Sequence, residues 1–334
     1  MPTSQLPSSS ESTRSEHGRL GSWELEVGVD RSGKIDRMQT RRAFIQTVSA
    51  GAIAVTAAPD VARVALGGQA ALKHPATGTL GLQLYSLRHL FGKGDIPGTL
   101  AMVRRWGFTE VEAGGTYNLS AADFAAAVKK AGLRIASTGA DYAMLEKDPG
   151  AAIEQAQAFG AEQVMCAWIP HQGTFSRADV DRAVPVFTKV GQAMRDAGLR
   201  FLYHVHGYEF QPGPDGTHFD ALARATQPGI VDFQMDVFWV VHGGGNPVEL
   251  FAKYPGRFPS THLKDLRKGT RVGDPSGTAP DEASVPLGQG MIDVPGILRA
   301  ANKDGVRYHF IEDEHPESER QIPRSLEYLA TLRL

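Results

Sequence analysis

Eight short apolar runs follow one another from Leu80 to the end of the chain, at intervals that average about 32 residues. Each run leads through a polar or glycine-rich turn into a helical stretch, and a glycine usually precedes the next run. Strands that alternate with helices in this way predict a parallel sheet. The runs are Leu80–Tyr85, Thr109–Glu112, Leu133–Thr138, Gln163–Trp168, Arg200–His206, Ile230–Asp236, Phe258–Lys264 and Arg307–Glu312.

The number of repeats predicts that this sheet closes. Residues 80–332 number 253, close to the roughly 250 residues of a typical (β/α)8 barrel. A doubly wound open sheet is the alternative, but Tyr85-Ser86-Leu87-Arg88 stands where a Gly-x-Gly-x-x-Gly turn would be expected. We therefore predict an α/β protein with one catalytic domain, a (β/α)8 TIM barrel, over residues 79–334. Its one long connection is Arg267–Gly290.

The region before the barrel has the features of an export signal. Arg41 and Arg42 precede an apolar stretch, Phe44–Ala58, that is too short to span a bilayer. Paired arginines, a short apolar run and a small-residue end resemble a twin-arginine signal; an ordinary amphipathic helix is the alternative. We predict a periplasmic or extracellular protein that leaves the membrane after cleavage. The predicted segments are 1–37 (disordered or spurious extension), 38–58 (signal peptide) and 59–78 (linker).

Charge and cysteine content exclude several classes of protein. The chain has 35 Lys and Arg against 37 Asp and Glu, a net charge of −2, whereas a nucleic-acid-binding surface needs an excess of positive charge. The single Cys166 excludes an internal disulfide framework and a multi-cysteine zinc site. We expect a small-molecule partner and no nucleic acid, and we leave homo-oligomerisation open.

Polar residues stand at the carboxyl ends of the last four runs, on the strand face opposite the apolar residues. Period-2 alternation directs them into the barrel at its catalytic rim. Isolated charges are costly to bury there, and a divalent cation would remove that cost. Mixed nitrogen and oxygen ligation suits Mn, Co, Mg, Fe or Zn, and we take Mn as the first candidate. The predicted ligands are His204, Asp236, His262 and Glu312; His206 could replace His204, and Glu314 could replace Glu312.

The strand ends also resemble a known family. Tyr203-His204-Val205-His206-Gly207-Tyr208-Glu209-Phe210 is similar to the His-Asn-His-Asp-Phe-Glu-Phe segment of xylose isomerase-like TIM-barrel proteins, which include sugar phosphate isomerases and epimerases. Four later motifs follow in the family's order, and the first run resembles its first strand, so the resemblance covers residues 80–332. These further motifs are Leu82–Arg88, Met235–Trp239, His262–Asp265, Gly288–Asp293 and Ile311–Glu314.

The resemblance implies one metal ligand from each of strands five to eight. Ketose 3-epimerases of the family carry Glu, Asp, His and Glu, and His204 stands where their first glutamate would be. Val205 and Gly207 replace the usual Asn and Asp. The missing glutamate argues against a two-carboxylate epimerisation. Exported relatives resemble lyases or hydratases of 3-keto-glycosides, and C-glycoside deglycosidases are similar.

We therefore expect a metal-dependent sugar isomerase or epimerase that removes a proton next to a carbonyl through a metal-stabilised enediolate. A 3-keto-glycoside lyase or hydratase shares this first step, and a non-catalytic sugar-binding barrel is the alternative of another class. His206 is the first candidate base and Glu112 the second acid or base. Lys264 would hold an oxyanion or carboxylate, or form a salt bridge with a rim acid. The predicted substrate-binding residues are Gln83, Tyr85, Trp168, His171 and Trp239.

Overall fold

A computed structural model describes residues 72–334 of the protein. The extension at 1–37, the signal peptide at 38–58 and most of the linker at 59–78 lie outside the described residues, so the export prediction stays a prediction. Within the described part, no helix combines the length and the apolar character needed to cross a bilayer.

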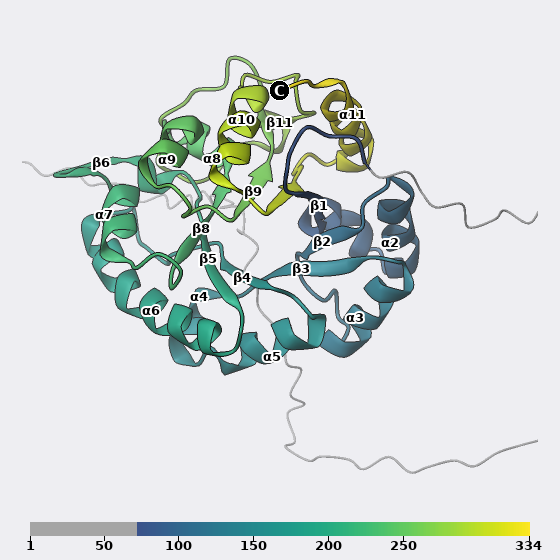
Figure 1. Ribbon diagram of the computed structural model, residues 1–334, viewed down its shortest axis with the longest axis horizontal. Helices are drawn as coiled ribbons and strands as arrows, with labels where there is room; N and C mark the ends of the chain where they lie inside the picture. The colour runs from purple at the N-terminus through teal and green to yellow at the C-terminus, as the bar shows by residue number, and fades with distance from the viewer. Residues whose placement is uncertain (1–71) are drawn as a thin grey trace, which may run out of the picture. The chain divides into compact units, whose positions relative to one another are not determined.

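The strands close into a barrel in which every neighbouring pair is parallel (Figure 1). This confirms the predicted (β/α)8 fold, and each apolar run supplies one strand. Several strands end a residue or two before the run does, because the chain turns at the barrel mouth. In order around the barrel, the strands are β1 (Thr79–Gln83), β12 (Tyr308–Ile311), β9 (Ser260–Leu263), β8 (Asp232–Asp236), β5 (Arg200–His204), β4 (Gln163–Cys166), β3 (Arg134–Gly139) and β2 (Glu110–Ala113).

The α-helices lie outside the strands (Figure 1). In chain order they are α1 (Arg88–Phe91), α2 (Ile96–Arg105), α3 (Ala121–Lys130), α4 (Tyr142–Lys147), α5 (Gly150–Phe159), α6 (Arg177–Asp196), α7 (His218–Ala225), α8 (Val237–His242), α9 (Pro247–Lys253), α10 (Val294–Asp304) and α11 (Ser318–Thr331). Short 3-10 turns are η1 (Leu84–Leu87), η2 (Tyr208–Phe210) and η3 (Asp281–Ala283). Two small hairpins pair β6 (Pro212–Gly213) with β7 (Gly216–Thr217), and β10 (Asp265–Leu266) with β11 (Ser284–Val285).

The main core lies between the strands and the helices. In β5 the outward side chains Phe201 and Tyr203 pack against Phe187 of α6, with ring centroids 5.3 and 5.2 Å apart. Phe233 of β8 packs in the same way against Phe219 of α7. Burying large aromatic rings on this layer stabilises the fold by roughly 1.5–3 kcal/mol per side chain. Consequently, the inward positions are available for polar groups.

The lower part of the barrel interior is aromatic. Tyr308 and Phe310 of β12 stack with centroids 5.7 Å apart, and the Phe310 ring meets the edge of His262. Gly81 of β1 leaves room for this ring, because a Cβ there would lie 2.7 Å from Phe310. The aromatic layer closes the barrel beneath the polar side chains at its mouth.

The long connection after β9 folds over the mouth of the barrel. Its Gly273 amide donates to the His242 carbonyl at the end of α8, over 2.7 Å, and Gly277 lies against Tyr208 and the His206 carbonyl. At its base, Asp265 accepts hydrogen bonds from the amides of Leu266, Gly288, Gly290 and Ile292 over 2.9–3.1 Å. This carboxylate therefore fixes both ends of the connection next to the catalytic rim.

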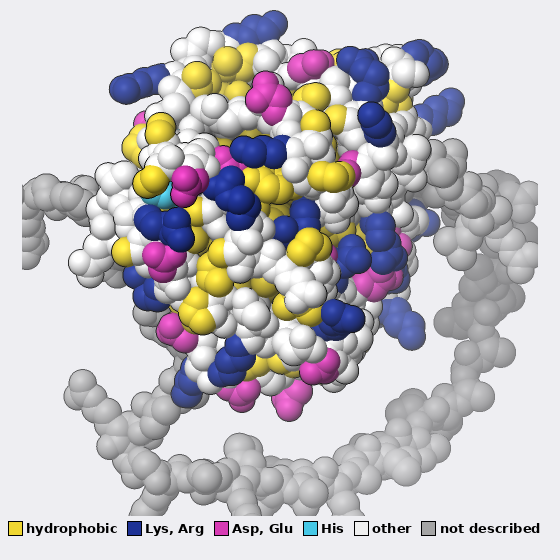
Figure 2. Space-filling view, turned by 60° about the vertical axis from the view of Figure 1, so that its left-hand side comes forward, with side chains coloured by type: hydrophobic (Ala, Val, Ile, Leu, Met, Phe, Trp, Pro, Cys, Tyr) yellow, Lys and Arg dark blue, Asp and Glu magenta, His cyan; other side chains and the backbone are white. Residues whose placement is uncertain are grey.

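The surface carries charges of both signs. On the face in Figure 2, Lys and Arg side chains are interspersed with Asp, Glu and apolar side chains. This distribution agrees with the near-zero net charge of the sequence.

Gly191 of α6 provides a test of the helix packing. A Cβ at this position would collide with the carbonyl oxygen of Ile230, so we predict that Gly191→Ala lowers the free energy of unfolding by about 2 kcal/mol or more. Gly150→Ala in α5 is the matched control, since the nearest atom to its Cβ would be the end of the exposed Asp148 side chain, at 3.1 Å, and not a backbone atom. Urea denaturation measures both; equal stabilities for the two variants would contradict the assigned packing.

Candidate metal centre

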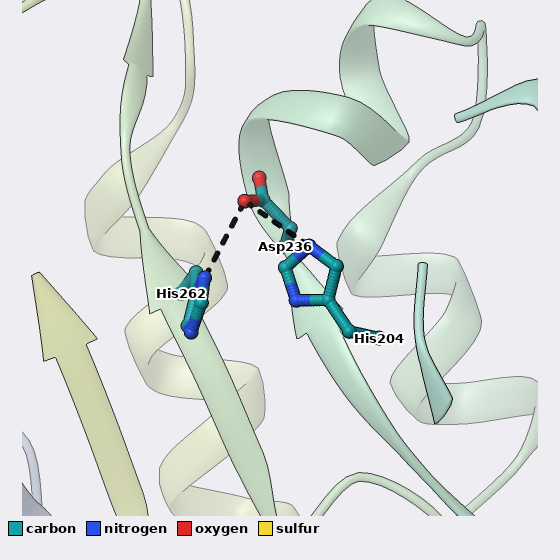
Figure 3. A group of neighbouring side chains, drawn as sticks. All are labelled: His204, Asp236 and His262. Atoms are coloured by element: carbon teal, nitrogen blue, oxygen red, sulfur yellow. Dashed lines mark ion pairs between the residues drawn. The ribbon is translucent and has the colours of Figure 1, made fainter. Parts of the chain in front are cut away.

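Three of the predicted ligands meet at the mouth of the barrel. His204 ends β5, Asp236 ends β8 and His262 lies on β9 (Figure 3). Asp236 Oδ2 lies 3.9 Å from His204 Nε2 and 3.7 Å from His262 Nδ1. Two ligand atoms that are each about 2.1 Å from one ion stand roughly 3–4 Å apart. The three groups are buried and have the spacing of a coordination shell.

The fourth predicted ligand, Glu312, follows the end of β12 and lies next to this group, where it contacts His262. Glu312 Oε2 lies 2.9 Å from His262 Nδ1, and the side chain is 8% exposed. Burial alone would lower the pKa of His262, but Glu312 and Glu112 raise it well above its ordinary value. The carboxylates thus favour a positive charge at this nitrogen, which either a proton or a metal ion can supply.

An unsatisfied oxygen shows that the site fits a cation. Asp236 caps α8, because its Oδ1 accepts a hydrogen bond from the Trp239 amide over 3.0 Å. This bond turns Oδ2 toward the two imidazoles, where it is buried and accepts no hydrogen bond from the described residues. Lys264 Nζ forms an ion pair with Oδ2 at 3.4 Å, but a buried carboxylate oxygen that accepts no hydrogen bond is still costly. A divalent ion between Oδ2, His204 Nε2 and His262 Nδ1 would satisfy all three atoms.

Glu112 fixes the protonation pattern of His262. Its Oε1 accepts from His262 Nε2 over 2.6 Å and from Gln83 Nε2 over 2.5 Å. Because Nε2 carries the proton, Nδ1 is the nitrogen that can donate its lone pair to a metal. Burial alone would raise the pKa of Glu112, but His262 and its other hydrogen-bond donors hold it below its usual value.

The same carboxylate acts on His204 through Gln234. Gln234 Nε2 donates to Glu112 Oε2 over 2.8 Å and to Ser260 Oγ over 3.0 Å. Its Oε1 must therefore face His204 Nδ1, at 2.9 Å, and accept the proton that this nitrogen carries. His204 Nε2 then presents its lone pair toward Asp236. One buried carboxylate thus orients both histidines.

This arrangement corrects two of the sequence-based predictions. Glu112 was expected to exchange protons with substrate, but it is fully buried and both of its oxygens accept hydrogen bonds. Gln83 was expected to bind a substrate hydroxyl, but its side chain donates to Glu112 and accepts from the Tyr85 amide. Both residues position the ligands, because their side chains are buried and their polar atoms are engaged in hydrogen bonds within the barrel.

Lys264 forms the salt bridge that was one of its two predicted roles. Its Nζ lies 3.2 Å from Glu312 Oε2 and 3.4 Å from Asp236 Oδ2, and it is paired closely with Glu314 Oε1. Burial would lower its pKa, but these three carboxylates raise it well above its ordinary value. Glu312 is therefore the acid that faces His262, whereas Glu314 faces Lys264.

His206 lies beside the candidate centre. Its ring is 5.3 Å from that of His204 and stacks on Trp239 at 5.0 Å. Its Nδ1 lies 2.9 Å from the Ala167 carbonyl, to which it donates, so Nε2 keeps its lone pair. Burial, followed by the neighbouring His204, lowers its pKa to about 3. His206 is therefore neutral at ordinary pH with an unprotonated Nε2, and a pKa this low makes it a weak base.

The predicted aromatic residues form one wall of the mouth. Trp168 stacks on His171 at 4.9 Å and meets the edge of His206 at 5.5 Å, and Trp239 continues the wall on the other side of His206. Tyr85 lies apart from them in η1, under the Arg88 guanidinium. A shallow hollow beside Trp239 and Lys264 is closed by the long connection at Ala279 and Pro280.

Two residues of the site were not identified from the sequence. Gln234 shares the inward parity of Asp236, and a polar residue at that position in a buried strand was the available signal. Glu209 is fully buried and accepts hydrogen bonds from the His206 amide, over 3.0 Å, and from the Tyr203 hydroxyl. It lies outside the strand, where alternation gives no guidance.

Comparison with known proteins agrees with this architecture. The family model of the xylose isomerase-like TIM barrel matches residues 100–332. An inosose dehydratase of Clostridium botulinum (strain Alaska E43 / Type E3) is 31% identical over 149 residues, which are 42% of this chain and 48% of that protein. The match therefore spans about half the length of the dehydratase.

Two solved structures share the fold. A sugar phosphate isomerase/epimerase from Parabacteroides distasonis ATCC 8503 aligns with a TM-score of 0.65 and 24% identity, over 80% of this chain and 97% of that one. The IolI protein with a bound zinc atom aligns with a TM-score of 0.57 and 15% identity, over 75% and 95%.

Glu112→Gln tests the orientation of the two histidines. The amide cannot accept from His262, Gln83 and Gln234 together, so we predict that the dissociation constant for Mn²⁺ rises by about 10–100-fold. Isothermal titration calorimetry measures this constant. Glu110→Gln is the matched control, because this acid precedes Glu112 by two residues on β2 and pairs with Arg134 instead; a similar loss in both variants would contradict the assigned role.

Glu209→Gln tests the buried acid behind His206. Burial raises the pKa of Glu209 to about 7, above the value in the unfolded chain. The folded protein therefore holds more protons between about pH 4.5 and 7, and the stability contributed by this group falls as the pH rises through that window. We predict that the variant loses this part of the pH dependence, on the order of 2 kcal/mol.

Urea denaturation at pH 5 and pH 7.5 gives the change in the free energy of unfolding with pH for the unaltered protein and for Glu209→Gln. Glu146→Gln, at an exposed site on α4, is the control and should show the same pH dependence of the unfolding free energy as the unaltered protein. If Glu209→Gln has the same pH dependence of stability as the unaltered protein, Glu209 is already ionised at pH 5.

Proposed function

This chain belongs to the xylose isomerase-like TIM-barrel family, and we propose that it is a divalent-metal-dependent enzyme that removes a proton next to the carbonyl of a sugar or related polyhydroxylated ketone. The observation that supports this proposal most directly is the buried Asp236 Oδ2, which faces two imidazole nitrogens and accepts no hydrogen bond from the described residues. Sugar isomerisation or epimerisation is the reaction class that we infer first, from the family.

The metal would be held by His204, Asp236, His262 and Glu312. When bound, a divalent cation supplies Lewis-acid stabilisation of the negative charge that develops on a substrate oxygen. The nitrogen ligands and the zinc of the IolI structure suit a transition metal; we take Mn²⁺ as the first ion to test.

His206 would receive the substrate proton at Nε2. The Ala167 carbonyl fixes Nδ1–H, and the Trp239 ring fixes the plane of the imidazole. Glu209 holds the backbone amide of His206, so the base is restrained from two directions. Trp168 is partly exposed and provides apolar surface on which the C–H face of a sugar ring can stack. Trp239 is 5% exposed and lies against His206 and Lys264, so it supports the base and the lysine instead.

Elimination is the second candidate reaction, and the position of Glu112 favours it. Epimerisation requires proton transfer on both faces of the carbon. Because Glu112 is withdrawn beneath His262 and His204 replaces a glutamate, His206 is left as the candidate base at the mouth. A single base suffices for the loss of water or of an aglycone from the neighbouring carbon. The similarity to inosose dehydratase supports this candidate, with keto-cyclitols or 3-keto-glycosides as substrates.

Solvent deuterium exchange tests the proposal. Protein loaded with Mn²⁺ is incubated in D₂O with ketoses, 3-keto-glycosides and an inosose, and the products are followed by NMR. We predict exchange next to the carbonyl: exchange alone indicates isomerisation, and loss of water or aglycone indicates elimination. Asp236→Asn should remove metal binding and exchange together, because it neutralises the central ligand.

His206→Ala separates the base from the metal site. We expect it to bind Mn²⁺ and to lower the exchange rate by about 100-fold or more, whereas His218→Ala on α7 should exchange at the normal rate. Exchange at the full rate in His206→Ala would remove it from the base role. No exchange with any of these ketones in the metal-loaded protein would favour a sugar-binding barrel without catalysis.

A further inference from the structure

We propose that Lys264 is an internal cation that competes with the metal ion for Asp236 and Glu312, and thereby lowers the affinity of the site for that ion. This inference rests on the proposed metal site, but it concerns how tightly the ion is held.

The competition follows from shared oxygen atoms. Asp236 Oδ2 lies 3.4 Å from Lys264 Nζ and 3.7 Å from His262 Nδ1. Glu312 Oε2 lies 3.2 Å from Nζ and 2.9 Å from the same His262 nitrogen. The two carboxylate oxygens that would bind the ion are therefore the ones that the ammonium contacts.

The lysine cannot avoid the ion by moving into solvent. Its side chain is 1% exposed, and its Nζ lies 5.2 and 5.3 Å from the ring centroids of Phe238 and Trp239. The two aromatic faces hold the ammonium beside the site through cation–π attraction. A divalent ion bound by Asp236 and Glu312 would stand close to a fixed positive charge, in surroundings with little water to screen the repulsion.

Glu314 moderates this competition. Its Oε1 is paired closely with Lys264 Nζ, and no contact joins it to the two histidines among the ion pairs of the described chain. Glu314 therefore offers the Lys264 ammonium a carboxylate that is not one of the proposed metal ligands. With Glu314 present, Lys264 can remain bound when Asp236 and Glu312 turn to the metal; without it, the lysine has only the ligand carboxylates.

Substitutions at these two positions should change metal affinity in opposite directions. We expect Lys264→Met to lower the dissociation constant for Mn²⁺ by about tenfold or more, because the competing charge is gone. We expect Glu314→Gln to raise it. The effect of Glu314→Gln should shrink when it is made in the Lys264→Met background, because the two residues act through the same contact. Lys268→Met is the matched control, since it removes an exposed lysine four residues away and should leave the constant unchanged.

Calorimetric titration of the metal-stripped proteins with Mn²⁺ measures these constants, and thermal unfolding with and without the ion supplies a second readout. Without metal, Lys264→Met should be less stable than the unaltered protein, because the buried Asp236 and Glu312 and the partly exposed Glu314 lose their cation; Mn²⁺ should restore its stability. If Lys264 had only a structural role, Lys264→Met would lower the stability equally with and without Mn²⁺. If the single variant does not fold, the Lys264→Met/Glu314→Gln pair, compared with Glu314→Gln alone, isolates the lysine.

The outcomes separate this inference from the proposed function. If the unaltered protein binds Mn²⁺ and removal of Lys264 leaves the constant unchanged or raises it, the competition is wrong and the metal site stands. If neither the unaltered protein nor any variant binds a divalent ion, the proposed metal site itself is wrong.

Discussion

The hydrogen bonds accepted by Glu112 orient the catalytic end of this barrel. Its two oxygens accept from His262, Gln83 and Gln234, and through Gln234 it also determines which nitrogen of His204 faces the site. An imidazole that rotates freely and exchanges between two tautomers binds a metal ion weakly, because fixing its orientation and tautomer costs free energy when the ion binds. Here that ordering is complete in the folded protein. The orientation of the candidate ligands therefore depends on a residue that is itself fully buried.

The fold makes such a buried carboxylate tolerable. The stabilising core lies outside the strands, where Phe201 and Phe233 pack against the helices, and the aromatic pair Tyr308 and Phe310 closes the barrel below. Between these layers the parallel register sets Asp236 opposite His262 and Gln83 opposite Glu112. The polar side chains can therefore satisfy one another without contributing much to the stability of the domain.

The barrel and the composition of the site follow from local rules that the sequence displays. Apolar runs at regular spacing specify the strands, and period-2 alternation assigns Asp236 and His262 to the interior. Alternation cannot tell Glu312 from Glu314, because both share one face. In the structure Lys264 contacts both acids, and Glu312 alone of the two also contacts His262 among the ion pairs of the described residues. The sequence also did not predict the buried hydrogen bonds of Glu112, since they join Gln83 of the preceding strand with Gln234 and His262 of strands far along the chain. The alternation of residues along a strand predicts the face on which a side chain lies, whereas its role depends on the residues that it contacts.

Charge balance explains why a lysine belongs at this centre. Asp236, Glu312 and Glu314 lie within reach of one ammonium, and a domain that buried Asp236 and Glu312 without a cation would lose several kcal/mol of stability. Lys264 allows the barrel to fold before any ion arrives. The same positive charge then opposes the ion that the carboxylates attract, so the stability of the metal-free protein and the affinity for metal vary inversely. Glu314 sets the balance between them, because it retains the lysine without taking part in the ligand group.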